Sequence, residues 1–202
     1  MLTRPARAAI AAALGLAAAG AGLGFWRRAR AAEPLPVYWD VPRFALTDQG
    51  GRTRTPGDLR GAPWVADFIF TRCGGVCPRM TERVARLARS APPGTRFVSV
   101  TVDPAHDTPD VLARYAADFG AGPDWWFLTG PRDELYRLAV DGFKLQAMEI
   151  PKDEQGADGP FLHSSKLALV DATSRVRGYY DSDDEAAMTR LQGDLLLLAR
   201  AR

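Results

Sequence analysis

Short apolar runs alternate with helical patterns along most of the chain, and this alternation limits the possible folds more than any other feature of the sequence. Residues 64–70 and 96–102 are apolar enough for buried strands, and residues 126–128 add a third. Between them, residues 78–90 and 108–119 have the apolar spacing and the early proline of helices. Strands that alternate with helices form βαβ units, so we expect a mainly parallel sheet.

Hairpins and further helices complete this order at both ends. The patterns predict an N-terminal hairpin, a helix that ends near Gly142, a C-terminal hairpin and a last helix, at residues 44–55, 131–140, 166–180 and 183–199. The polar residues 149–160 are expected to form a loop. The whole order is typical of an α/β protein with an elaborated thioredoxin-like fold and an N-terminal hairpin.

The first 32 residues differ from the rest of the chain. They contain five Arg and no acidic residue, and they enclose an uncharged run of 19 residues at 8–26. A membrane-spanning helix needs about 20 such residues, so we expect residues 1–32 to anchor the protein in a membrane. A cleaved signal segment and a soluble helix are the alternatives. Residues 33–42 contain three prolines and are expected to form a linker, which leaves residues 43–202 for the folded domain.

The charge of the chain changes sign after the N-terminal segment. Residues 33–202 carry 21 basic and 24 acidic side chains, a net charge of −3, although the whole chain has a net charge of +2. A domain with a net negative charge has no electrostatic reason to bind nucleic acid. We therefore expect no nucleic-acid partner.

The chain has two cysteines, Cys73 and Cys77, which lie between the first core strand and its helix. If the first helical turn includes both, their Cβ atoms lie about 5–6 Å apart, close enough to share one metal ion. The helix N-terminus is expected to lower their pKa values and favour thiolates. In an exported protein such a pair indicates a metal site or a redox-active disulfide. A structural disulfide or inert core thiols are the alternative.

A histidine supplies a candidate third ligand. His163 precedes the strand expected at residues 166–171, and in a thioredoxin-like sheet the start of that strand faces the cysteine loop. We therefore expect His163 to bind the metal with Cys73 and Cys77. His106, the other histidine, lies in a polar loop and is expected to be a solvated residue.

Two thiolates and one imidazole favour copper over zinc. Cu(I) accepts three ligands and prefers thiolate, whereas structural zinc needs four protein ligands. Three ligands also leave the site open, which suits a metal that must be passed on. On ligand spacing alone, zinc remains the alternative.

Four segments resemble motifs of the Sco/SenC family, in the order in which that family has them. They are residues 70–78 (FTRCGGVCP), 100–109 (VTVDPAHDTP), 126–130 (WFLTG) and 163–164 (HS). The resemblance covers about residues 43–198. Gly74 stands where the family often has Pro, and Thr101 stands where Ser is more common.

This resemblance implies a thioredoxin-like domain outside the cytoplasm, on the periplasmic side of a membrane. It also implies that the domain binds one copper ion per chain through Cys73, Cys77 and His163, with Asp103 near the site. The task that it implies is delivery of copper to the subunit of cytochrome c oxidase that receives the dinuclear copper A site. Further partners would be the membrane, other copper carriers and thiol reductases.

The main alternative is a membrane-tethered thiol–disulfide oxidoreductase that acts on the cysteines of exported proteins. Such a protein has no need of His163, which is why we expect a carrier rather than an enzyme. The two roles can coexist, because a copper A site needs reduced cysteines before it is loaded. A non-catalytic binding module with a structural disulfide and, more distantly, a peroxidase are the other classes considered.

Overall fold

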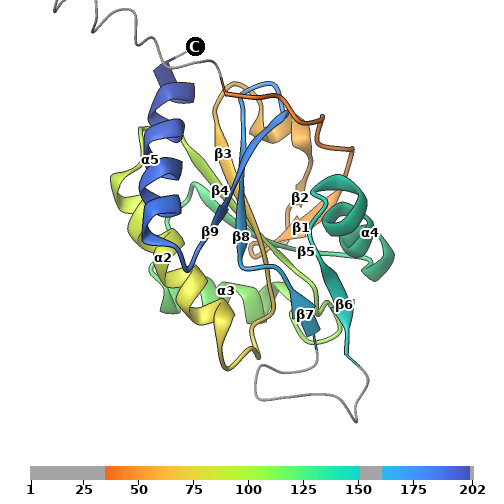
Figure 1. Cartoon of the computed structure of the whole chain (residues 1–202). Coiled ribbons are helices and arrows are strands. Elements are labelled where there is room, and N and C mark those ends of the chain that lie inside the picture. Colours follow the sequence, from red (N-terminus) through yellow and green to blue (C-terminus); the bar gives the residue numbers. More distant parts are fainter. Residues whose placement is uncertain (1–34, 151–160, 201–202) are drawn as a thin grey trace, which may run out of the picture. The chain divides into compact units, whose positions relative to one another are not determined.

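A seven-stranded sheet forms the centre of the computed structural model, which describes residues 35–150 and 161–200 (Figure 1). The strands lie in the order β2-β1-β5-β4-β3-β8-β9. Their bounds are β1 (Leu46–Asp48), β2 (Thr53–Arg54), β3 (Trp64–Ile69), β4 (Arg96–Thr101), β5 (Trp125–Thr129), β8 (Lys166–Val170) and β9 (Val176–Asp181). Strand β3 is buried along its whole length, as its apolar sequence predicts.

Helices cover both faces of this sheet. Figure 1 shows α2 (Val76–Ser90) and α5 (Glu185–Arg200) on one side and α4 (Arg132–Arg137) on the other. Helix α3 (Pro109–Asp118) lies on the same face as α2, since the Tyr115 hydroxyl of α3 is 3.0 Å from the Thr81 hydroxyl of α2. The opposite face carries Trp64 and Phe68 of β3, whose rings pack against Phe143 beyond α4.

The sheet is mixed, so the expectation of a mainly parallel sheet is wrong. Only the pairs β3–β4 and β4–β5 are parallel, whereas β1–β2, β1–β5, β3–β8 and β8–β9 are antiparallel. Crossover helices α2 and α3 join the three parallel strands, as βαβ units require. After α4 the chain reverses direction and enters β8 from the opposite end, so both outer parts of the sheet are hairpins.

The local elements agree well with the sequence patterns. The N-terminal hairpin is confirmed by the pairing of β1 with β2, and the C-terminal hairpin by that of β8 with β9. Thr108 caps α3 through its hydroxyl, which accepts a hydrogen bond from the backbone N–H of Val111 at 3.4 Å. Helix α5 covers most of the last predicted helix.

The region after β5 differs from the sequence pattern. The helix expected at residues 131–140 is a short α4 followed by a π-helical turn, η2 (Leu138–Gly142), in which the N–H of Phe143 reaches the carbonyl of Leu138 at 2.9 Å. A Cβ at Gly142 would lie 2.8 Å from the Pro42 ring, so only glycine allows this close approach. The wider turn thus gives room to the segment that leads into the domain.

Two short strands form a separate ribbon that the sequence did not predict. They are β6 (Ala147–Glu149) and β7 (Phe161–His163), and they pair antiparallel. Most of the loop expected at residues 149–160 lies outside the described residues. Figure 1 shows the ribbon at the same end of the sheet as the loop between β3 and α2.

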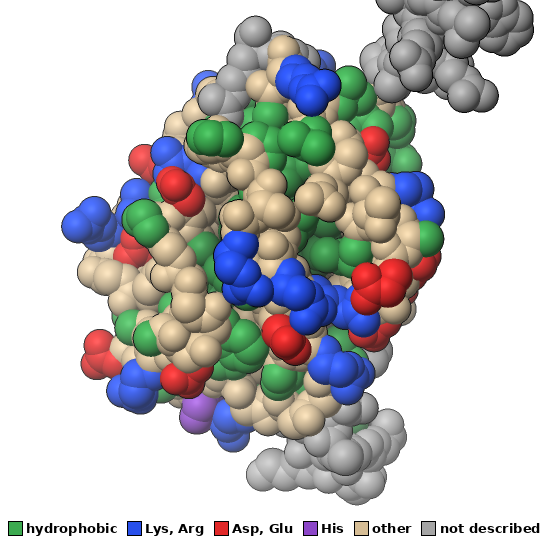
Figure 2. Space-filling model, turned by 90° about the vertical axis from the view of Figure 1, so that its left-hand side faces the viewer, with side chains coloured by type: hydrophobic (Ala, Val, Ile, Leu, Met, Phe, Trp, Pro, Cys, Tyr) green, Lys and Arg blue, Asp and Glu red, His purple; other side chains and the backbone are tan. Residues whose placement is uncertain are grey.

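The outer surface over α2 and α5 carries charged side chains of both signs, with hydrophobic side chains between them (Figure 2). Figure 2 looks onto this side and shows basic and acidic side chains interspersed over it. An ion pair between Arg83 and Glu185, at 2.8 Å, joins the two helices. In residues 35–150 and 161–200 no helix is long and apolar enough to cross a membrane. The anchor expected at residues 8–26 lies outside the described residues.

Candidate metal and thiol site

The two cysteines lie where β3 gives way to α2. Cys73 belongs to the loop that follows β3, and Cys77 is the second residue of α2. Both are unoxidised and buried, with 4% of Cys73 and none of Cys77 exposed. The condition that the first helical turn includes both cysteines is therefore not met, because Cys73 precedes the helix.

Hydrogen bonds nevertheless bring the two side chains together. The backbone N–H of Cys77 donates to Sγ of Cys73 at 3.4 Å, and the two side chains also share a hydrogen bond. The Cys73 sulfur thus accepts a hydrogen bond from one of the N–H groups in the first turn of α2, which have no acceptor within the helix itself. The N–H of Phe70 donates to Sγ of Cys77 at 3.5 Å, which ties the helix start back to the end of β3.

Burial determines the protonation of Cys77. It raises the pKa of the Cys77 thiol far above its ordinary value, and the hydrogen bond with the Cys73 side chain raises this pKa further. The sequence-based expectation of a lowered pKa is therefore wrong for Cys77, because loss of solvation outweighs the helix N-terminus. A bare thiolate is disfavoured at this position, whereas a disulfide or a bound cation removes the isolated negative charge.

Two buried carboxylates hold the residues that precede Cys73. Both come from the loop between β4 and α3. Asp107 accepts hydrogen bonds from the backbone N–H and the hydroxyl of Thr71. Asp103 accepts from Arg72, with Nε at 3.1 Å and Nη2 closer. Because both carboxylates are almost fully buried, they fix the approach of the chain to Cys73.

Asp103 was expected near the site only from the family resemblance, and Asp107, Thr71 and Arg72 were not predicted from the sequence. The feature of the sequence that could have identified these contacts is the pair of acidic residues, Asp103 and Asp107, that follows β4. In a parallel sheet, this position lies beside the loop that follows β3.

His106 is bound to this loop and is only part-exposed. Its Nδ1 lies 2.9 Å from Asp107 Oδ1 and 3.3 Å from the Thr71 hydroxyl. Asp103, His106 and Asp107 offer ligand atoms within 4.8 Å of one another. However, Arg72 already binds Asp103, and two hydroxyls and His106 already bind Asp107, so this cluster is a hydrogen-bonded support for the cysteine loop.

The backbone brings His163 to the cysteine end of the sheet. Strand β8 runs antiparallel to β3, with Ala168 opposite Ala66 and Val170 opposite Trp64. The start of β8 therefore lies beside the end of β3, and His163 ends β7 three residues before β8 begins. The side chain of His163 lies outside the described part of the structure.

A third buried carboxylate lies in β3 itself. Asp67 is 1% exposed, and burial raises its pKa to about 7, against a smaller lowering by its hydrogen bond from Ser99. The apolar run at residues 64–70 predicted a buried strand, and Asp67 was not among the predicted site residues. The feature of the sequence that marks Asp67 is a charged side chain within a run of residues expected to be buried on both faces of the sheet.

A sheet of this order, with two cysteines between β3 and α2, defines a thioredoxin-like protein with a thiol or metal site at the carboxyl ends of its parallel strands. Comparison with known proteins then identifies the group within that class. The chain belongs to the SCO1/SenC family, whose family model matches residues 39–192.

Relatives and solved structures agree with this assignment. The chain is 33% identical over 151 residues to the SCO1 protein homolog of Bacillus subtilis, a match that covers 72% of this chain and 76% of the relative. It resembles copper-bound ScoI of Bradyrhizobium japonicum with a TM-score of 0.65 at 25% identity, over 79% of this chain and 99% of that one. It resembles BsSco with a TM-score of 0.70 at 28% identity, over 83% and 97% of the two chains. BsSco is described as having a disulfide switch and as a member of the Sco family of cytochrome c oxidase assembly proteins.

Proposed function

We propose that this protein carries copper, and that Cys73, Cys77 and His163 hold one copper ion per chain. The observation that carries the proposal is the contact between the two cysteines, whose side chains meet at the start of α2. Thiolates are the ligands that Cu(I) prefers, and three donors satisfy it. The copper-bound structure of a similar ScoI supports the same choice of metal.

The surroundings of the cysteines favour a cation over free thiolates. Because Cys77 is buried, its thiolate is costly unless a positive charge neutralises it. A bound Cu(I) ion supplies that charge and displaces the thiol protons. The Asp103–Arg72 ion pair would then stabilise the metal site by holding in place the loop that contains Cys73.

The third donor is assigned from the topology of the sheet. The start of β8 lies beside the end of β3, and His163 is close to it in sequence. An imidazole from this side would complete the donor set without a rearrangement of the sheet. Neutral imidazole binds Cu(I) and Cu(II).

We further propose that the copper is delivered to the copper A site of cytochrome c oxidase, on the outer side of a membrane. BsSco, a similar structure, belongs to a family of oxidase assembly proteins. Residues 8–26 would anchor the domain, because an uncharged run of 19 residues is close to the length of a membrane span.

Thiol–disulfide exchange is the second candidate function. Two thiols in mutual hydrogen-bond contact can form a disulfide with little movement, and the BsSco structure is described in terms of a disulfide switch. In this role the reduced pair would reduce the cysteines of an exported protein. Copper delivery also requires reduced cysteines, so the two functions use the same state of the site.

Anaerobic titration of the reduced full-length chain with Cu(I) tests the proposal. Saturation near one equivalent is expected for the native chain, and Cys73→Ser and Cys77→Ser should each lose most of the binding. Met188→Leu, which removes a thioether on α5, is the control and should still bind one equivalent. Binding that survives both cysteine substitutions would rule out the assigned site.

A further inference from the structure

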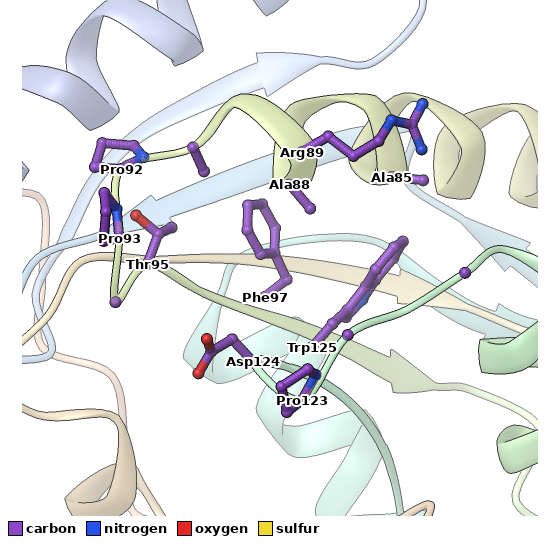
Figure 3. A pocket seen from close by; sticks show the side chains of 14 residues that line it. Ala85, Ala88, Arg89, Pro92, Pro93, Thr95, Phe97, Pro123, Asp124 and Trp125 are labelled. Carbon is purple, nitrogen blue, oxygen red and sulfur yellow. The ribbon is translucent and has the colours of Figure 1, made fainter.

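A cavity of about 310 Å³ lies at the amino ends of β4 and β5, on the face of the sheet that carries α2 (Figure 3). Two aromatic side chains of the sheet, Phe97 and Trp125, form its inner wall, and only 3% and 2% of them are exposed. The last turns of α2 and the loops before β4 and β5 form the other walls. Apolar hollows of this size that are lined by aromatic side chains are typical binding sites for small molecules.

The cavity is remote from the cysteines. Strands β3 and β4 run parallel, and Trp64 lies opposite Arg96 at the end of the sheet where the cavity lies. The cysteine loop follows Ile69, at the other end of β3. Five residue steps along a strand separate the two ends by roughly 17 Å. A molecule in this cavity would therefore not touch the proposed copper ligands.

Hydrogen bonding and packing hold the Trp125 ring in place. Its indole Nε1 donates a hydrogen bond to the Ser99 hydroxyl at 2.9 Å, and its ring stacks on Phe127 with centroids 5.1 Å apart. The Phe97 ring lies 6.1 Å from the Trp125 ring, at an interplanar angle of 56°. The two rings thus form a fixed aromatic wall, which favours contact with a further flat ring.

The loops that border the cavity are also fixed. The backbone N–H of Thr95 donates to the carbonyl of Pro92, and that of Trp125 donates to the carbonyl of Gly122, each at 3.1 Å. Pro92 and Pro123 limit the φ angles of these turns. A site that is already formed loses little conformational entropy when a ligand binds.

One basic side chain, Arg89, borders the cavity from the last turn of α2. It is exposed, and its guanidinium has no ion pair within residues 35–150 and 161–200. By contrast, Arg86 of the same helix is paired with Glu82 at 3.1 Å. Arg89 is therefore a cation beside an aromatic wall that is available to an outside anion.

The direction of the Arg89 side chain suits an anion in the cavity. Helical side chains lean toward the amino end of their helix, and Figure 3 shows Arg89 running along α2 toward Ala85, on the side of the Trp125 ring. Its guanidinium thus lies away from the carbonyl groups at the end of α2, which disfavour anions. In the same view the carboxylate of Asp124, the acidic residue of the lining, points away from the Trp125 ring.

We propose that this cavity binds a small aryl carboxylate, a molecule with one flat ring system and one carboxylate group. The ring lies against Trp125 and Phe97, and the carboxylate accepts two hydrogen bonds from the Arg89 guanidinium, whose planar fork matches it. A neutral aromatic molecule would leave Arg89 unused, and an aliphatic acid would leave the aromatic wall unused. The site is separate from the proposed copper function, because neither cysteine contributes to it.

The indole N–H signals of the isotope-labelled full-length chain report binding in a two-dimensional NMR spectrum. The chain has five tryptophans, and Trp125→Phe identifies the signal of Trp125. This signal should shift as 2-naphthoate is added, because the bound ring lies against the indole, with a dissociation constant on the order of 0.1 mM. Neutral 2-naphthamide and aliphatic cyclohexanecarboxylate should each bind at least about tenfold more weakly.

Three variants make the test specific. Arg89→Gln should weaken the binding of 2-naphthoate about tenfold and leave that of 2-naphthamide within about twofold, because only the charged contact is lost. Arg86→Gln, on the same helix, is the matched control and should bind 2-naphthoate like the native chain. Ala88→Phe places a ring in the cavity that Ala88 lines, so it should abolish the binding of both compounds. Well-dispersed indole signals show that each variant is folded.

Two results would overturn the proposal. One is a Trp125 signal that does not move up to the solubility limit of 2-naphthoate, and the other is equal binding by the folded Arg89→Gln and Arg86→Gln variants. Cys73→Ser should bind 2-naphthoate like the native chain, although it should lose most of its copper. The outcome of this titration is therefore distinguishable from that of the copper titration.

Discussion

The backbone N–H of Cys77 donates a hydrogen bond to the sulfur of Cys73, so one thiol caps the helix that begins beside the other. A single loop of five residues thus positions both sulfurs without a disulfide. The position of the Cys73 sulfur thus depends on the backbone of Cys77.

Oxidation of this pair should exclude copper. A disulfide sulfur is no longer a thiolate and binds metal poorly, so the oxidised chain should retain less than about a tenth of the copper of the reduced chain. Treatment with a thiol reductant should restore one equivalent. The measurement is copper content after gel filtration, beside a free-thiol assay on the same fractions. Equal copper in oxidised and reduced protein would mean that the metal binds elsewhere.

Replacement of His163 should separate copper binding from thiol chemistry. His163→Ala should weaken Cu(II) binding more than about tenfold and Cu(I) binding less, since two thiolates alone still hold Cu(I). The rate of thiol–disulfide exchange should remain close to that of the native chain, because both cysteines stay. Metal affinities by competition titration and exchange rates by stopped flow give the comparison.

His106→Ala is the matched control for this experiment. The His106 ring supports the cysteine loop through Asp107 and Thr71 and is not a proposed ligand, so its loss should lower the Cu(I) and Cu(II) affinities by the same small factor, about twofold. If His163→Ala and His106→Ala had the same effect, the third donor would have to be sought elsewhere.

Loss of the Asp103 charge should loosen the cysteine loop. Asp103 is 2% exposed and holds Arg72, whereas the Arg72 side chain is half-exposed. Asp103→Asn replaces a charge-assisted contact with a neutral one, so the free energy of unfolding should fall by roughly 2 kcal/mol. Glu82→Gln breaks an exposed pair with Arg86 and should cost less than about 1 kcal/mol. Urea denaturation gives the unfolding free energies of the two variants. Equal losses in the two variants would contradict the prediction.

Asp171 should stabilise the protein against acid. Burial opposes its ionisation, but hydrogen bonds from Thr173, Arg177 and Arg175 lower its pKa from 3.8 to about 2. Because the pKa is lower in the folded state, its contribution is complete above pH 4 and is lost as the pH falls through 2. This contribution is roughly 2 kcal/mol. Thermal unfolding of Asp171→Asn should therefore differ from that of the native chain at pH 6 and approach it near pH 2.

Asp67 should have the opposite effect on the pH dependence of stability, because it should destabilise the folded state as the pH rises. Its folded-state pKa of about 7 lies above the ordinary value of 3.8, so the folded state binds the proton more tightly than the unfolded one. The stabilisation is complete below pH 4 and is lost as the pH rises to 7, by up to roughly 4 kcal/mol. Asp67→Asn should flatten this fall between pH 4 and 7. A native-like slope in the variant would show that another group is responsible.

The strand and helix pattern was readable from the sequence because each element is defined by short-range chemistry. Thr108 and Pro109 begin α3 by capping and by a fixed φ angle, whatever lies around them. The mixed sheet was not readable, because strand direction depends on where the chain returns after α4. The β6–β7 ribbon was missed because its three-residue strands are too short to show alternation.

The cysteine pair was evident from spacing, but its electrostatics were not. The helix N-terminus is evident from the sequence, whereas the complete burial of Cys77 in the first turn of α2 depends on the packing of the whole domain. The carboxylates that support the loop were hidden because Asp103 lies 31 residues after Arg72 and Asp107 lies 36 residues after Thr71. Such contacts become visible only when β3 and β4 are paired in register.

The antiparallel pairing of β3 with β8 also affects the order in which the site is built during synthesis. The cysteines and the strand β3 emerge early, whereas β8, with His163 just before it, follows about 90 residues later. Closing a connection of that length is slow compared with forming the helix start that joins Cys73 and Cys77. A newly synthesised chain therefore displays the two sulfurs before β8 is in place, and oxidants and metal ions compete for that pair before the sheet is complete.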